Sequence, residues 1–209
     1  MSNYRRLGAL PIRGGGSLVA DQIVRSAQPS DFAVSDRQVF LSHRAQTVVD
    51  LRSSHERQRY PSTWLNDQPL SVIYAGITRD LRASEAYRER LRQDLSAQGA
   101  TNTMKAIYSD YPLAAMHRVT QLCHTLLARR GPVLVHCAAG KDRTGFVIAM
   151  LLEAIGVERE AIIEDYLLSN DHVAGDIEQQ RQRLKVHFQL PDHMSPPDGV
   201  VTALMGGEC

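Results

Sequence analysis

The residues of this chain best suited to chemistry lie in one short stretch, "VLVHCAAGKDRTGF", which runs from Val133 to Phe146. Cys137 is a nucleophile when its thiol is ionised, and Arg143 carries a planar guanidinium that can bind two oxygens of one oxyanion. The residues between them include two alanines and a glycine, which leave the backbone N–H groups unobstructed. A thiolate at the bottom of such a ring of donors, closed by an arginine, is suited to attack on a bound phosphate.

A strand and a helix must position these side chains. The run from Val133 to His136 is typical of a strand buried on both faces, and "TGFVIAMLLEAIG" after it predicts a central buried helix. The loop between them can curl its N–H groups into an anion-binding nest, to which the helix adds its partial positive N-terminus. We expect Thr144, at the helix start, to donate a hydrogen bond to the sulfur and ease its departure in a second step.

Simpler interpretations compete with this one. A single cysteine at the end of a strand is usually a small core residue, and a bare C-x5-R pattern often arises by chance. Here the pattern stands between a predicted strand and a predicted helix and includes HC, AG and RTG, which together favour the functional interpretation. Two alternatives stay open: a phosphate-binding module without turnover, and a rhodanese-like sulfur transferase, which has little reason to retain both Arg143 and Thr144.

The rest of the sequence predicts an α/β fold, a central, mostly parallel, twisted sheet of four to five strands flanked by helices. Strands are expected through Ile23 and Val24, over Thr47–Leu51, over Ser71–Ala75 and over Val133–His136. Helices are expected over residues 84–99, 101–111, 112–131, 144–156, 159–170 and 176–184. Pro112 is expected at a first helical position and Gly131 just past a helix end.

The bulk composition predicts one domain over residues 1–209. The chain is 43% hydrophobic and 22% charged with a formal net charge of +1, so no strong field argues for nucleic acid or a membrane surface. Three cysteines without a CxxC pair fit a reducing compartment, and the N-terminus has no apolar signal region. We therefore expect a cytoplasmic chain with no stable membrane insertion, export without a signal peptide being the alternative. No histidine spacing indicates a metal, so no metal or other cofactor is expected.

The stretch "HCAAGKDRTG" resembles the signature loop of the protein tyrosine phosphatase superfamily, HC-x5-R-[ST]. Its Lys141 and Asp142 resemble the bacterial atypical branch, whose members act on phosphotyrosine, on phosphoserine or phosphothreonine, and on phosphoinositides. The stretches "VRSAQP", "VVDLRSSHE" and "EDYLLSND" also resemble that branch, so the resemblance extends from about residue 4 to about residue 190.

The resemblance implies a cysteine phosphatase fold, a two-step reaction through a phosphocysteine intermediate and no metal. Cys137 would be the nucleophile, Arg143 the phosphate-binding arginine and Thr144 the hydroxyl donor. The backbone cradle would comprise Ala138, Ala139, Gly140, Lys141, Asp142 and Arg143. The substrate would be a phosphorylated protein or a phosphoinositide. Lys141 is suited to additional phosphates on an inositol ring, or it pairs with Asp142.

The proton donor is less well marked. The superfamily commonly uses an aspartate some tens of residues before the cysteine, but its familiar WPD tripeptide is absent. We favour Asp80, because it follows the third predicted strand, where the family places its acid loop. Asp110 and Asp142 are alternatives, as is a site with no dedicated acid. Asp94 is expected on a solvated helix face.

Three further features surround this loop. Residues 81–112 are expected to form a helical insertion, either a lid over the site or an extra packing layer. His136 is expected to hydrogen-bond the loop rather than act as a base. Asp50, Arg52 and Glu56 are expected to form a structural cap and salt bridge, with an ion-pair network beneath the site as the alternative.

Overall fold

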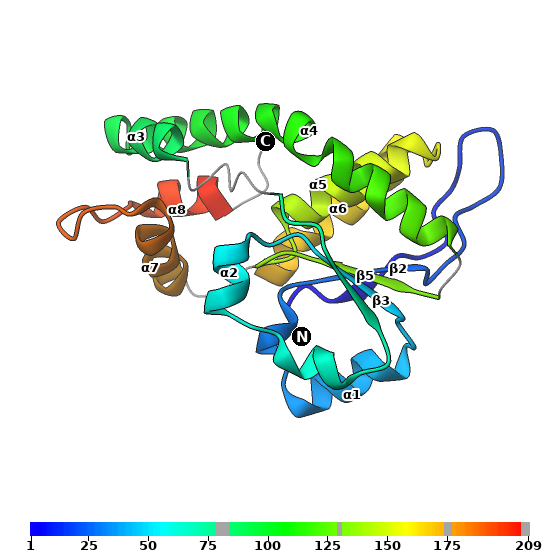
Figure 1. The fold of residues 1–209 in the computed structure, drawn as a ribbon. Coiled ribbons are helices and arrows are strands. Elements are labelled where there is room, and N and C mark those ends of the chain that lie inside the picture. The colour runs from blue at the N-terminus through cyan, green and yellow to red at the C-terminus, as the bar shows by residue number, and fades with distance from the viewer. Residues whose placement is uncertain (78–83, 129–130, 174–176, 206–209) are drawn as a thin grey trace. The chain divides into compact units, whose positions relative to one another are not determined.

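The computed structural model of the chain describes residues 1–77, 84–128, 131–173 and 177–205 (Figure 1). It divides into two compact units, Met1–Thr78 with Ala115–His172, and Arg79–Ala114 with Val173–Cys209. The stretch that carries Cys137 and Arg143 lies in the first unit. The expectation of a single domain with a lid at 81–112 stays a prediction.

A five-stranded sheet forms the centre of the first unit, in the order β1-β2-β5-β3-β4. Strand β1 is antiparallel to β2, and the other neighbouring pairs are parallel. The strands are β1 (Arg5–Arg6), β2 (Ile23–Ser26), β3 (Thr47–Asp50), β4 (Ser71–Tyr74) and β5 (Val133–His136). The mostly parallel α/β sheet expected from the sequence is therefore confirmed, with the two-residue strand β1 in addition.

The register of the sheet brings three strand ends together. Every residue of β2, β3 and β5 is buried, as continuous apolar runs predict for strands covered on both faces. His136 at the end of β5 lies between Ser26 of β2 and Asp50 of β3. Because ligands of parallel α/β sheets bind at the carboxyl ends of the strands, the loops after these residues are where a site belongs.

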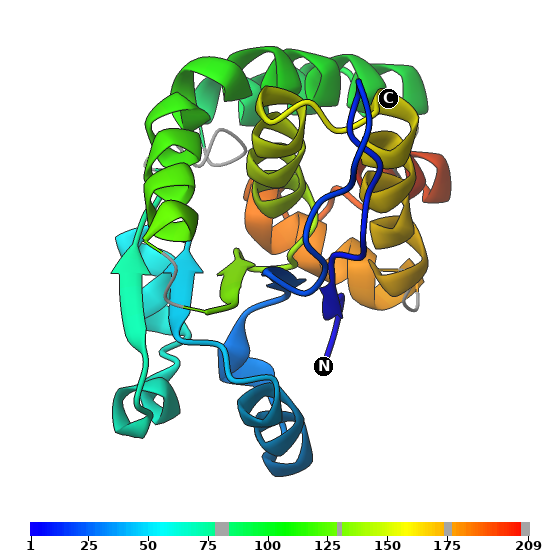
Figure 2. The same cartoon turned by 90° about the vertical axis from the view of Figure 1, so that its right-hand side faces the viewer.

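Helices cover both faces of this sheet (Figures 1 and 2). Helices α5 (Asp142–Ala154) and α6 (Arg159–Val173) lie side by side over one face, and α1 (Val34–Ser42) lies on the other. Helix α2 (Ser54–Arg59) follows β3, and short 3-10 turns cover Pro29–Asp31 and Thr63–Asp67. The side of the sheet near α1 is packed by a cluster that includes Phe32, Phe40 and Leu65.

The second unit is helical. It contains α3 (Glu85–Gln93), the first part of α4 (Ala97–Leu127), α7 (Ile177–Phe188) and α8 (Asp198–Met205). The Arg181 guanidinium pairs with Asp198 and so links α7 to α8. Arg92 of α3 donates to the carbonyl of Gln189 at 3.2 Å.

The predicted helix boundaries in this region are wrong. The structure ends α3 at Gln93 and begins α4 at Ala97, and Pro112 lies inside the 31-residue α4 rather than at a helix start. Ser96 explains the break, since its Oγ accepts a hydrogen bond from the N–H of Gly99 at 3.0 Å and caps the new helix. A side-chain cap thus marks the boundary that proline and glycine were expected to mark.

Candidate active site

Strand β5, a short loop and helix α5 hold the candidate nucleophile, as predicted. Cys137 directly follows β5, and α5 begins at Asp142. Cys137 is only 3% exposed, and Arg143 and Thr144 are buried in the first turn of α5. The partial positive charge of the helix N-terminus is therefore directed at the loop that follows the cysteine.

Gly140 lets the loop turn tightly. Its φ is +68°, in the left-handed region that L side chains rarely adopt. A Cβ at this position would also collide with the backbone carbonyl oxygen of Ser26 at the end of β2. The glycine is therefore required both by its own backbone conformation and by the closeness of β2.

Arg143 is held by a carboxylate from α2. Its Nη1 and Nη2 donate to Oε2 and Oε1 of Glu56, both at 2.7 Å. Burial acts to raise the pKa of Glu56, but the hydrogen bonds and charge of Arg143 outweigh it and lower the pKa to about 2. Glu56 is thus an anion across the physiological range. It uses two of the five guanidinium N–H groups and fixes the plane of the fork.

Glu56 is itself positioned by the start of α2. Its Oε2 accepts a hydrogen bond from the N–H of Ser53 at 2.8 Å, and the Ser53 Oγ accepts from the Glu56 N–H at 3.3 Å. This reciprocal capping box is what the spacing S-x-x-E produces at a helix N-terminus. Glu56 is therefore the helix cap that was expected, and its ion pair is with Arg143 rather than with Arg52.

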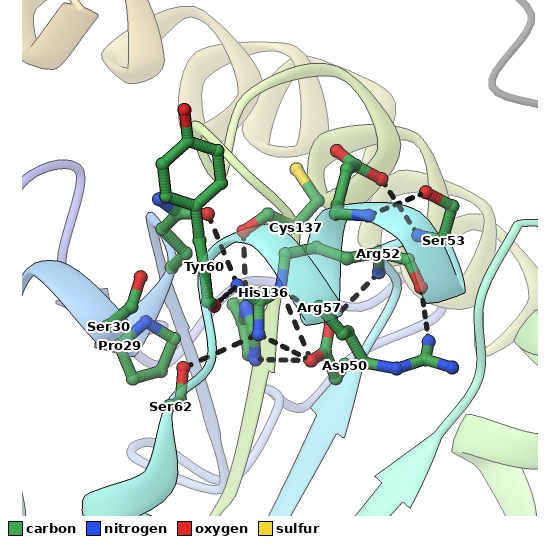
Figure 3. A network of polar contacts seen from close by, with 12 residues as sticks. Pro29, Ser30, Asp50, Arg52, Ser53, Arg57, Tyr60, Ser62, His136 and Cys137 are labelled. Carbon is green, nitrogen blue, oxygen red and sulfur yellow. Dashed lines mark hydrogen bonds and ion pairs between the residues drawn. The ribbon is translucent and has the colours of Figure 1, made fainter.

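A buried network lies beneath the cysteine (Figure 3). Arg52 is 1% exposed and donates to both oxygens of Asp50 through Nε at 3.0 and 3.2 Å and through Nη2 at 2.8 Å. Burial acts to raise the pKa of Asp50, but the hydrogen bonds from Arg52 keep it below its ordinary value. The ion-pair network that the sequence left as an alternative is therefore present for Asp50 and Arg52.

His136 joins this network to the cysteine. Its Nδ1 lies 3.1 Å from the carbonyl oxygen of Cys137, and its Nε2 lies 3.7 Å from Oδ2 of Asp50. Burial lowers the pKa of His136 to about 4, and the Asp50 carboxylate opposes the shift only in part. The ring is thus neutral at pH 7, and because a carbonyl only accepts, we assign its proton to Nδ1. This hydrogen bond to the loop is the role expected for His136.

Arg52 also fixes the backbone after α2. Its Nη1 donates to the carbonyl oxygen of Tyr60, the residue after α2, at 2.8 Å. Tyr60 is 45% exposed, and Figure 3 shows its ring and the Cys137 thiol pointing to the same side of the network. Arg52 therefore ties the backbone that follows α2 to the network beneath Cys137.

The other predicted loop residues are buried or half-buried. The hydroxyl of Thr144 is buried and has no hydrogen-bond partner among the described residues, so the expected bond to the Cys137 sulfur is not formed in this structure. Lys141 is only 4% exposed, so its side chain stays against the protein rather than in solvent, and Asp142 is half-buried.

The favoured proton donor, Asp80, lies outside the described residues. Asp110 accepts a 2.5 Å hydrogen bond from the Tyr87 hydroxyl within the second unit. Asp94 directly follows α3 and accepts from the Ser96 N–H at 3.1 Å, so it caps the junction between two helices instead of lying on a helix face. Asp80 stays a prediction.

One cavity lies next to the Asp50–Arg52 network rather than at the loop after Cys137. A cavity of about 140 Å³ is lined by Asp50, Arg52, Arg57 and Tyr74, but neither Cys137 nor Arg143 lines it.

Within the described ranges, no group of three or more His, Cys, Asp or Glu side chains could hold a metal ion. Across the same ranges, every helix is too short or too polar to cross a membrane.

Two buried polar residues behind the loop, Arg25 and Asn3, were not predicted from the sequence. Arg25 of β2 is fully buried, and its Nη1 binds Oδ2 of Asp165 in α6 at 2.7 Å. Asn3 is also buried and donates to the carbonyl of Ala139 at 3.2 Å. The signal for Arg25 was present, because a charged residue interrupts the apolar strand "IVRS" and must have a partner there.

The amino-acid sequence of this chain is similar to those of known phosphatases. Residues 1–205 match the sequence family described as the tyrosine phosphatase family. Over 79 residues the chain is 52% identical to the triple specificity protein phosphatase PtpB of Mycobacterium tuberculosis, covering 35% of this chain and 27% of that protein. Over 175 residues it is 32% identical to the protein H16_A0669 of Cupriavidus necator, covering 83% of this chain and 62% of that protein. The chain thus spans less than two thirds of the length of these relatives.

Among solved structures, the chain is similar to P. aeruginosa TpbA, with a TM-score of 0.39 and 21% identity over 90% of this chain and 89% of that one. The family match rests on the sequence and does not depend on this structural likeness.

Proposed function

Because the chain belongs to the tyrosine phosphatase family, we propose that it hydrolyses phosphate monoesters through a covalent phosphocysteine intermediate. The observation that carries the proposal is the arrangement of Cys137 between the end of β5 and the N-terminus of α5, with Arg143 held across the loop by Glu56. This arrangement supports a site in which a nucleophile, a nest of backbone donors and a fixed guanidinium act together.

In the first step the Cys137 thiolate attacks phosphorus in line with the leaving oxygen. The S–P bond forms as the P–O bond to the alcohol or phenol breaks, and the leaving oxygen takes a proton from an acid, which we assign to Asp80. The loop N–H groups and Arg143 bind the equatorial phosphate oxygens. Their contribution is positioning and charge stabilisation, the main sources of catalysis in phosphoryl transfer.

In the second step water attacks the phosphocysteine. The water gives its proton to the carboxylate left by the first step, the S–P bond breaks, and inorganic phosphate and the thiolate are released. Thr144 is suited to donate to the departing sulfur, because its buried hydroxyl has no partner among the described residues. His136 is neutral and bonded to the Cys137 carbonyl, so it holds the loop and takes no part in proton transfer.

The substrate is proposed to be a phosphorylated protein, with phosphotyrosine as the first candidate. The exposed ring of Tyr60, which points to the same side of the network as the thiol, is suited to an apolar contact with a phenyl group. The name of PtpB, a triple specificity protein phosphatase, supports a wider range that includes phosphoserine and phosphothreonine. Phosphoinositides are included because the loop resembles that of the bacterial atypical branch; Lys141 is only 4% exposed, so its side chain would have to turn outward to meet an additional phosphate.

Phosphate release from a panel of substrates tests the proposal. The panel holds phosphotyrosine, phosphoserine and phosphothreonine peptides and each phosphoinositide, with Cys137→Ser as the matched inactive variant. We expect release by the unaltered chain and none by Cys137→Ser. If the chain binds phosphopeptide but releases phosphate from no substrate, the proposed enzymatic function is wrong and the chain is a phosphate-dependent binding module.

A further inference from the structure

The carbonyl oxygens of the loop after Cys137 are held by donors from outside the loop. The Nη2 of Arg25 donates to the carbonyl oxygen of Gly140 at 2.9 Å and lies 3.4 Å from that of Lys141. Arg25 comes from β2, more than a hundred residues before the loop, and none of its surface reaches solvent. A buried guanidinium is thus directed at backbone carbonyls of the candidate phosphate cradle.

The two preceding carbonyls of the loop are held in the same way. The backbone N–H of Gln28 donates to the carbonyl oxygen of Ala138 at 2.9 Å. The Nδ2 of Asn3 donates to the carbonyl oxygen of Ala139 at 3.2 Å. Together with Arg25, these groups bond four successive carbonyl oxygens, from residue 138 to residue 141.

Peptide geometry gives these bonds a consequence for the cradle. In a trans peptide the C=O of one residue and the N–H of the next point in opposite directions, and no cis peptide bond is found among the described residues. Holding the carbonyl of Gly140 on the β2 side therefore holds the N–H of Lys141 on the opposite side. The same relation fixes the N–H groups of residues 139 to 142. The donors from Asn3, Arg25 and Gln28 thus orient the N–H groups of the loop.

Arg25 is itself held from α6. Asp165 binds its Nη1 at 2.7 Å, and the hydroxyl of Ser169 lies 3.0 Å from its Nη2. Arg5 of β1 donates to Oδ1 of the same Asp165 through Nε at 3.0 Å. One carboxylate therefore binds two arginines, of which only Arg25 contacts the carbonyl oxygens of the cradle.

A buried ion pair of this kind costs desolvation that an apolar residue would avoid, and Ile23 and Val24 next to Arg25 are apolar. We propose that Arg25 is a positioning residue for phosphate binding, which acts by fixing the loop carbonyls so that the N–H groups converge on the anion. The inference rests on the proposed phosphate site and adds a role for a residue that never touches the substrate.

Binding of inorganic phosphate, measured by calorimetry on the full chain, tests this role without requiring turnover. Arg25→Lys keeps the charge and loses the fork, and Arg25→Gln loses both. We expect phosphate affinity to fall by about tenfold in Arg25→Lys and by more in Arg25→Gln. In activity assays, KM should rise more than kcat falls, with both variants kept well below their melting temperatures.

Arg181→Gln is the control, because it removes the ion pairs with Glu178 and Asp198 in the second unit and leaves the donors to the loop carbonyls in place. We expect a loss of thermal stability with phosphate affinity changed by less than about threefold. If Arg25→Gln does not fold, Arg25→Lys and Asn3→Ala give the same comparison.

Three results would overturn the inference. Wild-type phosphate affinity in a folded Arg25→Lys or Arg25→Gln variant would show that Arg25 only stabilises the fold. An equal loss of affinity in Arg181→Gln would show that general stability, and not the carbonyl bonds, sets the affinity. No phosphate binding by the unaltered chain would refute the phosphate site, and the inference with it, whereas the first two results would leave the proposed function intact.

Discussion

The carboxylate of Glu56 and the guanidinium of Arg143 meet side by side, with two N–H···O bonds of 2.7 Å between residues 87 positions apart in the sequence. Glu56 belongs to the capping box of α2 and Arg143 to the first turn of α5. The pair therefore ties the ends of two helices together and fixes the arginine that the proposed reaction requires. The contribution of this ion pair to the free energy of unfolding can be measured from how that free energy changes with pH.

Glu56→Gln should destabilise the protein at pH 7 and change its response to acid. The folded pKa of Glu56, about 2, lies below its ordinary value of 4.5, so the pair stabilises the fold above pH 4.5 and the gain is lost as the pH falls through about 2. The shift corresponds to about 3 kcal/mol at neutral pH. Urea unfolding at pH 7 and pH 3 should show a cost in Glu56→Gln that shrinks at the lower pH.

Glu153→Gln is the control for this measurement, because Glu153 forms an exposed ion pair with Arg13. Exposed pairs contribute about 0–1 kcal/mol, so this variant should unfold nearly like the unaltered chain. A Glu56→Gln variant with the same cost at both pH values would contradict the account of the pair.

His136 should remain neutral in the folded protein until the pH approaches 4. Its ordinary pKa is 6.5, and burial lowers it to about 4, so the unfolded chain takes up the proton first. The fold should therefore lose stability as the pH falls from 6.5 to 4, and His136→Gln should flatten this part of the profile. Titration of the His136 ring by NMR checks the assignment directly, and a midpoint near 6.5 in the folded state would refute it.

Gly140→Ala should disrupt the loop. A positive φ with an added Cβ costs about 1–2 kcal/mol, and the Cβ would in addition meet the Ser26 carbonyl. We expect a lower melting temperature and loss of inorganic phosphate binding. Gly8→Ala is the control, since nothing lies within 4 Å of a Cβ built there. Unchanged phosphate affinity in Gly140→Ala would mean that the loop tolerates a different path.

Asp80→Asn should slow turnover selectively. An alkoxide leaving group needs a proton more than a nitrophenolate does, so kcat on an alkyl phosphate should fall by about 10²–10⁴ and much less on p-nitrophenyl phosphate. Asp110→Asn is the matched control, because Asp110 is bonded to Tyr87 in the second unit. Full turnover of alkyl phosphates by Asp80→Asn would exclude Asp80 and direct attention to Asp142.

Thr144→Val should slow the second step more than the first. The variant keeps the shape of the side chain and removes the hydroxyl proposed to assist the departing sulfur. Stopped-flow assays with an aryl phosphate should show a burst of phenol followed by slower turnover, with the steady rate reduced by about tenfold. Thr103→Val is the control, as Thr103 of α4 also has a buried hydroxyl without a partner among the described residues. A slowed burst with no change in steady turnover would refute the assignment.

The strands were predictable from sequence because their apolar runs are continuous and end in polar residues, as in "TVVD" and "VLVH". Helices α1 and α2 were missed, since both are short and mostly polar. The break between α3 and α4 was misplaced because a side-chain cap at Ser96 decides it, whereas Pro112 is accommodated inside a long helix. Strands with one clear apolar pattern were thus predicted correctly, whereas the helix boundary was misplaced where a serine cap and a proline both suggested a helix start.

The candidate site divides in the same way. Cys137, Arg143 and Thr144 are found from one contiguous motif. The partner of Arg143 could not be chosen from sequence, because Glu56 also satisfies a capping box and long-range pairing depends on how the helices pack. Arg25 was missed because its role exists only once β2 lies beside the loop, although a charge in a buried strand was a signal that it needed a partner.

The central claim is that Cys137 carries the phosphoryl group during turnover. The most direct measurement is rapid quenching of a reaction with ³²P-labelled phosphotyrosine peptide in denaturant, followed by mapping of the labelled peptide by mass spectrometry. The account predicts one labelled residue, Cys137, with more label in Thr144→Val and none in Cys137→Ser. Turnover without label on Cys137, or turnover that persists in Cys137→Ser, would contradict the phosphocysteine mechanism.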